Sequence, residues 1–226
     1  RRYKNYNRII LKIEMMKIAV FISGNGSNLQ SLIDKANSPN CSYEISCVIS
    51  NNPNAFGLKR AQKNNIESII VNHKDFKNRE DFDLEIENRL KNIDFDLIVL
   101  AGFMRILGKN LVKKYSNKII NLHPSLLPKY PGLNTHMQAL ENKDTYHGAT
   151  IHLVDEGLDT GKIIGYSKFK IEDDDCLNSL LAKTHDKEHK LLPTICSLIA
   201  EQKIIFKHGD ILIDGTTYEK GKEFIF

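Results

Sequence analysis

Short apolar runs alternate with amphipathic stretches through the first half of the chain. Five runs rich in β-branched residues are typical of buried strands: 17–23, 45–51, 68–71, 96–102 and 118–122. Four stretches with apolar residues at helical spacing lie between them: 29–36, 55–65, 79–93 and 108–115. Strands that alternate with helices of this length form parallel βαβ units, and continuously apolar strands suit a sheet covered on both faces. The expected fold class is α/β, with a doubly wound, mostly parallel sheet.

The pattern changes after residue 147. The runs 148–154 and 162–171 have no helix between them, so an antiparallel pair of strands is expected in the C-terminal part. A long amphipathic stretch over 176–202 predicts a helix, and Pro193 within it predicts a kink or break near 192. Residues 204–213 are expected to form a hairpin that turns at 208–210. Because no repeat or linker follows residue 16, one domain over 16–226 is expected, after an N-terminal extension over 1–15.

Composition excludes several classes of protein. Of the 226 residues, 41% are hydrophobic and 27% are charged, which excludes a disordered, collagenous or coiled-coil chain. No apolar run approaches the roughly 18 residues of a membrane span, so no membrane partner is expected. Residues 1–14 carry five basic side chains and one acidic one and account for the net charge of +4. The neutral remainder gives no indication of nucleic-acid binding. Four cysteines without a CxxC pair indicate a reduced, cytoplasmic protein.

A glycine-containing loop, 23–28, follows the first expected strand. Glycine allows a tight turn and a close approach to a ligand, and the next helix offers unpaired N–H groups to an anion. Leu29 occupies the third glycine position of a dinucleotide motif, and the Gly-Lys-Ser/Thr ending of a P-loop is absent. Two interpretations stay open: a tight turn capped by Ser27 or Asn28, and a phosphate site. The carboxyl end of a strand is where open α/β sheets bind ligands, which favours the phosphate site.

Asn121 and His123 end the fifth expected strand on the same side, because side chains alternate along a strand. An amide beside an imidazole offers two hydrogen-bond donors to a developing oxyanion. Three prolines within the next eight residues make the following loop rigid, although a single histidine is more often structural. The acidic loop 155–161 could place an aspartate against His123, raise the pKa of the imidazole and hold it protonated. Most loops of this composition are solvated turns.

Other clusters give weaker signals. His136, His147 and His152 are irregularly spaced for a metal site, and the HExxH motif is absent, so no metal is expected. The acidic run 173–175 is more typical of a helix start than of a metal site. Ser125 lies in no GxSxG motif, which disfavours a hydrolase serine.

Six segments, in this order and spacing, together resemble the folate-dependent formyltransferase family. They are AVFISGNGSNLQSLID (19–34), ISNNPNAFGLKRA (49–61), LAGFMRIL (100–107), NLHPSLLPKYPG (121–132), HGATIHLVDEGLDTG (147–161) and KEHKLLP (187–193). The resemblance covers about residues 16–205 and implies a Rossmann-like formyltransferase domain. Its site is expected at the carboxyl ends of the first, fourth and fifth strands, with a cis Leu127–Pro128 bond. The residues that depart from the family pattern are Met137, Lys162 and His185.

The resemblance also implies roles for individual residues. The catalytic triad matches Asn121, His123 and Asp159. The ribonucleotide phosphate loop matches Gly26, Ser27 and Asn28, and the substrate segment matches His185, Asp186, Lys187 and Glu188. Folate binding is implied for Arg79 at the glutamate tail, and for Met104, Arg105, Ile106, Leu107, Asn121, Asp155, Glu156, Gly157, Leu158 and Asp159 around the pterin.

The implied reaction uses 10-formyltetrahydrofolate as cosubstrate and small molecules as partners, without a metal. Its formyl group passes to the amine of 5-phosphoribosylglycinamide in purine biosynthesis, catalysed by a cytoplasmic monomer or homodimer. An oxyanion would form between Asn121 and protonated His123, while Asp159 orients the imidazole and accepts a proton from the attacking amine through water. Three alternatives stay open: methionyl-tRNA as acceptor, water as acceptor, and a non-catalytic nucleotide-binding module. A neutral body and short segments at both ends disfavour the first two, and the intact triad disfavours the third.

Overall fold

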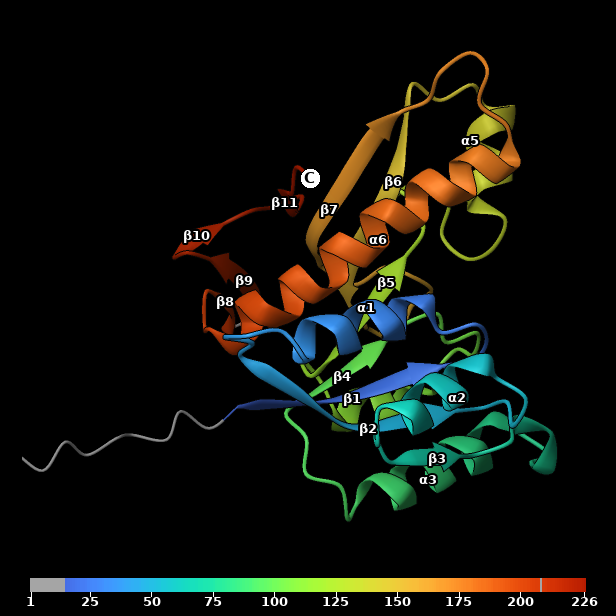
Figure 1. Ribbon diagram of the computed structural model, residues 1–226, viewed down its shortest axis with the longest axis vertical. Helices are drawn as coiled ribbons and strands as arrows, with labels where there is room; N and C mark the ends of the chain where they lie inside the picture. The colour runs from blue at the N-terminus through green and yellow to red at the C-terminus, as the bar shows by residue number, and fades with distance from the viewer. Residues whose placement is uncertain (1–14, 208) are drawn as a thin grey trace, which may run out of the picture.

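The computed structural model describes residues 15–207 and 209–226. An eight-stranded sheet forms its centre, in the order β11-β7-β6-β5-β4-β1-β2-β3 (Figure 1). Its strands are β1 (Met16–Ile22), β2 (Tyr43–Ser50), β3 (Ser68–Ile70), β4 (Leu97–Leu100), β5 (Ile119–His123), β6 (Tyr146–Leu153), β7 (Ile163–Lys170) and β11 (Lys222–Glu223). β1 to β5 are parallel, and β6 pairs antiparallel with both β5 and β7. The predicted α/β class and the antiparallel pair are confirmed.

Helices cover both faces of this sheet. They are α1 (Ser27–Ala36), α2 (Phe56–Lys63), α3 (Arg79–Leu90), α4 (Lys109–Lys114), α5 (Thr135–Glu141) and α6 (Leu177–Ala200), with a short 3-10 helix, η1 (His73–Asp75). The central strand β1 shows how one apolar run serves two faces. Its side chains Ile18, Val20 and Ile22 pack with α1 and α6, which lie side by side in Figure 1. Its intervening Ala19 and Phe21 pack with α3 and α4.

The strand order reverses between β1 and β4, because β1 continues to β2 on one side and β4 continues to β5 on the other. The connections that leave the two strands diverge at such a point and open a crevice beyond their carboxyl ends. The loops after β1, β4 and β5 therefore approach one another, and the site predicted from sequence lies among them. The Leu127–Pro128 peptide bond in the loop after β5 is cis, as predicted.

Pro193 does not interrupt α6. The helix runs without a break from Leu177 to Ala200, so the break predicted near residue 192 is wrong. Proline removes one hydrogen bond from a helix, but the neighbouring Leu191, Leu192 and Ile195 are fully buried. Burying one such side chain contributes about 1.5–3 kcal/mol, so packing outweighs the missing bond.

A separate three-stranded sheet follows α6. It contains β8 (Ile204–Lys207), β9 (Asp210–Ile213) and β10 (Thr216–Thr217). The antiparallel pairing of β8 with β9 confirms the hairpin predicted over 204–213. Residue 208 of its turn lies outside the described residues, as do residues 1–14 of the predicted extension. Within the described residues, no helix combines the length and apolar character needed to span a bilayer.

Candidate active site

A cavity of about 910 Å³ opens at the carboxyl ends of β4 and β5. Four chain segments form most of its wall, 102–107, 121–124, 131–137 and 152–159, and Leu177 and Leu181 of α6 complete it. The wall is largely apolar, and its polar groups converge at the end of β5. Ligand pockets commonly have this character, and their volumes run from about 300 to 1,000 Å³.

Three side chains converge at the inner end of this cavity. Asn121 and His123 both come from β5, and Asp159 comes from the loop after β6, where its φ of 53° lies in the left-handed region. The Asn121 Nδ2 donates to Asp159 Oδ1 at 3.2 Å. His123 Nδ1 lies 3.3 Å from Asp159 Oδ2. The structure therefore brings together the three residues that the sequence predicts as a triad.

The loop after β5 fixes the orientation of this group. His123 Nε2 lies 2.7 Å from the carbonyl oxygen of Tyr130 and donates to it. The Gly132 N–H donates to Asp159 Oδ2 at 2.8 Å. Ser125 is fully buried, and its hydroxyl donates to the carbonyl of Lys129 at 2.6 Å, which holds the loop in place. The Tyr130 carbonyl keeps a proton on Nε2, so the Nδ1 atom of His123 is the one that faces Asp159 and can gain or lose a proton.

Burial governs the charge state of the triad. It lowers the pKa of His123 below its ordinary value and outweighs the Tyr130 carbonyl and the Asp159 carboxylate, which both raise it. Asp159 raises the pKa of His123 as predicted, but burial has the larger effect, which opposes the prediction that Asp159 holds the imidazole protonated. Burial opposes the charge of Asp159 as well, but hydrogen bonds from His152 and the Gly132 N–H, together with His123, lower the pKa of this carboxyl. Both shifts favour a carboxylate beside a neutral imidazole in the free site.

His152 joins the triad as a fourth polar group. It is only 2% exposed, and its Nε2 lies 3.1 Å from Asn121 Nδ2 and 3.5 Å from Asp159 Oδ1. The irregular spacing of the histidines in the sequence disfavours a metal site at His152. It does not indicate that His152 contacts the triad. The signal that could have identified it is register, because His152 on β6 pairs directly with Asn121 on β5.

The loop after β1 leads into α1 through Gly26, whose φ is 74°. Gly26 is the N-cap of α1, so the alternative in which Ser27 or Asn28 caps the helix is wrong. The first N–H bonded within α1 is that of Gln30, which donates to the Gly26 carbonyl at 2.9 Å. The N–H groups of the preceding residues point out of the helix end, as at any helix N-terminus. This geometry suits an anion.

Close packing against α2 holds this loop. A Cβ atom at Gly26 would lie 2.6 Å from the Cα of Gly57, so both positions need the close approach that glycine allows. Arg60 donates from Nε to the Asn25 carbonyl at 3.0 Å and from Nη2 to the Asn25 side chain at 3.1 Å. Sequence reasoning missed Arg60, because its contact depends on how α2 crosses the loop.

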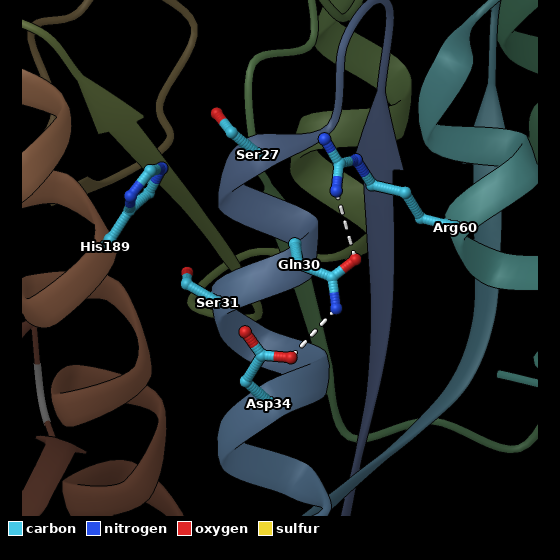
Figure 2. A pocket seen from close by; sticks show the side chains of 6 residues that line it. All are labelled: Ser27, Gln30, Ser31, Asp34, Arg60 and His189. Carbon is cyan, nitrogen blue, oxygen red and sulfur yellow. Dashed lines mark hydrogen bonds between the residues drawn. The ribbon is translucent and has the colours of Figure 1, made fainter. Parts of the chain in front are cut away.

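A groove of about 440 Å³ runs from this loop along α1. Figure 2 shows Ser27 at the N-terminal end of α1, with Arg60 extending from α2 on one side and His189 facing from α6 on the other. Gln30 bridges the groove floor, because its side chain accepts from Arg60 at 3.1 Å and donates to Asp34 at 2.8 Å. The predicted phosphate loop therefore lies at one end of a polar groove.

The predicted substrate segment on α6 divides into two parts. Glu188 is buried at 5% exposure and accepts from Asn28 Nδ2 at 3.0 Å, next to the phosphate loop. Burial raises the pKa of Glu188, although the Asn28 amide opposes the shift. Asp186 pairs with Lys190, and Lys187 donates to the Phe226 carbonyl at 3.0 Å, so both are engaged with other partners. The remaining member of the segment, His185, stacks on His189 with ring centroids 5.9 Å apart.

Most of the residues predicted for folate binding line the large cavity, but two do not. The wall of the large cavity includes Met104, Arg105, Ile106, Leu107, Asp155, Gly157, Leu158 and Asp159. Glu156 is not part of this wall and pairs instead with Lys109 and Lys113, at 3.4 and 3.3 Å. Arg79 begins α3 outside the wall, beside Asp83 and Gly108. In the described part of the chain, no three His, Cys, Asp or Glu side chains are grouped to hold a metal ion.

Comparison with known proteins gives one consistent match. The profile of the formyl transferase family matches residues 16–196. The phosphoribosylglycinamide formyltransferase of Haemophilus influenzae is 40% identical over 206 residues, which are 91% of this chain and 97% of that protein. The trifunctional purine biosynthetic protein adenosine-3 of Drosophila melanogaster is 44% identical over 81% of this chain, which spans 14% of that protein. The solved phosphoribosylglycinamide formyltransferase of Coxiella burnetii is 42% identical, with a TM-score of 0.88 over 93% of this chain and 100% of that one.

Proposed function

The chain belongs to the formyl transferase family, and from this premise we propose that it moves the formyl group of 10-formyltetrahydrofolate to the amine of 5-phosphoribosylglycinamide. The products are the N-formyl ribonucleotide and tetrahydrofolate, in purine biosynthesis in the cytoplasm. The observation that carries the proposal is the convergence of Asn121, His123 and Asp159 at the inner end of the large cavity. A carbonyl placed there meets an amide donor and an imidazole together.

The two substrates fit opposite ends of the site. The folate ring would occupy the apolar cavity between 102–107 and 152–159. The phosphate would bind the outward N–H groups at the start of α1, and the buried Glu188 would accept from the ribose hydroxyls. The amine then reaches the triad from the α1 side and the formyl carbon from the cavity side. Holding two reactants in this way can supply about 7–11 kcal/mol of the barrier.

Because burial lowers the pKa of His123 and favours its neutral form, the imidazole can take the proton that the amine must lose. As the amine attacks the formyl carbon, its C–N bond forms and the carbonyl electron pair moves onto oxygen. The amine proton passes to His123 Nδ1, directly or through water, and Asp159 stabilises the resulting imidazolium. Nε2 already carries its proton toward Tyr130, so Nδ1 is the atom that changes state.

The tetrahedral intermediate then lies between Asn121 and His123. The amide of Asn121 donates a hydrogen bond to its oxyanion, and the positive charge of the His123 imidazolium, whose new N–H faces Asp159, stabilises the same oxygen electrostatically. Collapse restores the carbonyl, breaks the bond to folate nitrogen and returns a proton to that nitrogen. The formyl group ends on the ribonucleotide, and the triad returns to its starting charge.

A formyl-transfer assay tests this function. Mixing the protein with 10-formyltetrahydrofolate and 5-phosphoribosylglycinamide should produce the deformylated folate, followed by its absorbance, together with one equivalent of formylated ribonucleotide. Methionyl-tRNA, and buffer without an acceptor, serve as comparison reactions. Transfer to methionyl-tRNA alone, or hydrolysis at the same rate without the ribonucleotide, would contradict the proposed function.

Replacing Ser27 with Asp tests the phosphate end of the site. A carboxylate at the first position of α1 would repel a phosphate bound to the neighbouring N–H groups, so the ribonucleotide KM should rise at least about tenfold. The folate KM should change little, because its cavity does not include Ser27. Ser68→Asp, the same change at an exposed position of β3, is the control. Equal increases in both KM values would place the phosphate elsewhere.

A further inference from the structure

Residues 102–107 of the irregular segment 102–108, between β4 and α4, form one wall of the large cavity. Two of its apolar side chains project from the protein, since Met104 is 67% exposed and Ile106 is 51% exposed. A segment without helix or strand hydrogen bonds depends on other contacts to keep one shape. The contacts that hold its backbone therefore decide the shape of the cavity.

Two buried side chains accept hydrogen bonds from this segment, one near each end. Near its start, the Met104 N–H donates to Ser23 Oγ at 2.7 Å, and Ser23 donates to Asn51 Oδ1 at 2.5 Å. At its end, the Gly108 N–H donates to Asp83 Oδ2 at 2.5 Å. Ser23 is 9% exposed and Asp83 is 6% exposed. Ser23 begins the loop 23–28, which contains the predicted phosphate loop. Asp83 belongs to α3 and has no contact with that loop among the hydrogen bonds of the described residues.

Asp83 is also a buried carboxyl group near two arginines. Burial raises the pKa of its carboxyl, and the Gly108 N–H, Arg79 and Arg105 oppose that shift, while Glu80 adds to it. Within the described residues, its second oxygen has no hydrogen-bond partner. Arg105 belongs to the cavity wall, and its guanidinium lies over the ring of Phe82 at 6.0 Å. A buried acid that is left partly unsatisfied needs a reason to be kept in a protein.

We propose that Asp83 is a positioning residue for the folate substrate. It holds the backbone at Gly108, directly after the cavity-lining residues 102–107, and its carboxyl group lies within electrostatic reach of Arg79 and Arg105. This inference rests on the proposed function, because it assigns the large cavity to folate.

Steady-state kinetics of Asp83→Ala test this role. The folate KM should rise about tenfold, because the variant removes a charge-assisted hydrogen bond from the wall. The ribonucleotide KM should stay within about twofold of the wild-type value, because Asp83 does not reach the phosphate loop. Asp83→Asn keeps the size and one acceptor oxygen, so its folate KM should fall between wild type and Asp83→Ala. Ser23→Ala should raise both KM values, since Ser23 adjoins both sites.

Gly108→Ala alters the same hydrogen bond through its other partner. A Cβ at Gly108 would collide with Asp83 Oδ2, so Gly108→Ala should reproduce the rise in folate KM. If the two residues act through one contact, the double variant should be no worse than the poorer single variant. Glu87→Ala is the matched control, because Glu87 also joins α3 to α4, through Lys114 at 2.5 Å, but lies outside the cavity wall.

Direct titration with tetrahydrofolate separates this inference from the proposed function. If the wild-type protein neither binds tetrahydrofolate nor transfers formyl, the proposed function fails. If the wild-type protein does both, and folded Asp83→Asn and Asp83→Ala keep the wild-type affinity for tetrahydrofolate, Asp83 is not a positioning residue. Equal rises in both KM values, with a lower melting temperature, would mean that Asp83 only stabilises the fold.

Discussion

Replacing Asp159 with Asn should lower kcat by about 10²–10⁴-fold, the range that general acid–base catalysis contributes. The amide keeps the size of the carboxylate, and it can still accept from the Gly132 N–H. It removes the negative charge beside His123 Nδ1, which lies 3.3 Å away. The imidazole then becomes a weaker base for the amine proton and carries a less stable positive charge beneath the oxyanion. The ribonucleotide KM should change little, because Asp159 is remote from the start of α1.

The same variant should shift the titration of His123. Burial already lowers the pKa of this imidazole, and Asp159 is one of the two groups that raise it. Removing the carboxylate therefore lowers the pKa further, and NMR should show the midpoint moving to lower pH. In the wild-type protein, kcat/KM should fall as the pH drops through the His123 pKa, because the protonated imidazole cannot accept the amine proton. This fall should begin below the ordinary value of about 6.5.

Asp173→Asn is the control for this experiment, since it makes the same chemical change on an exposed loop before α6. Its kcat and its His123 titration should match the wild-type values. Near-normal turnover in Asp159→Asn would contradict the mechanism, as would an unchanged His123 midpoint. A lost fold would show in the melting curve, and a normal ribonucleotide affinity would rule it out.

The sequence predicts most of the fold because its signals are repetitive. Each buried strand of the parallel part is continuously apolar, as in β1, and its two sets of side chains meet two layers of helices. The elements that the pattern does not predict are short. α5 has seven residues and β11 has two, so neither is long enough to show a period. The helix break predicted at Pro193 is wrong for a different reason. Tertiary packing around the proline outweighs its local tendency to interrupt a helix.

The residues of the site also differ in whether the sequence predicts them. Asn121 and His123 are two positions apart on one strand, so the alternation of side chains alone places them on the same face. Asp159 could be assigned only through the family resemblance, because 35 residues of loop, helix and strand separate it from His123. Asp83 and Arg60 give no sequence signal at all. Asp83 accepts from the Gly108 N–H and Arg60 donates to the Asn25 carbonyl, and a backbone atom leaves no pattern in the sequence.

Replacing Asn121 with Ala should also have a large effect, because it removes the amide that donates to the oxyanion. The loss of one such donor typically lowers the rate about 10²–10³-fold. In the free protein the Asn121 amide contacts both Asp159 and His152, so its Nδ2 is held toward the cavity before substrate binds. A hydrogen bond made to the oxyanion acts in the transition state and not on the bound substrates. The change should therefore appear in kcat and leave both KM values within a few-fold of wild type.

Two comparisons separate this donor role from a structural one. Asn88→Ala, on the exposed side of α3, should leave kcat unchanged. Asn121→Asp keeps the shape but replaces the donor with a carboxylate 3.2 Å from the one on Asp159, so repulsion should make its kcat lower than that of Asn121→Ala. The reverse order would mean that shape, and not hydrogen-bond donation, is what the reaction needs at this position. The oxyanion would then have to be stabilised by His123 alone, and Asp159→Asn should in that case abolish nearly all of the activity that Asn121→Ala retains.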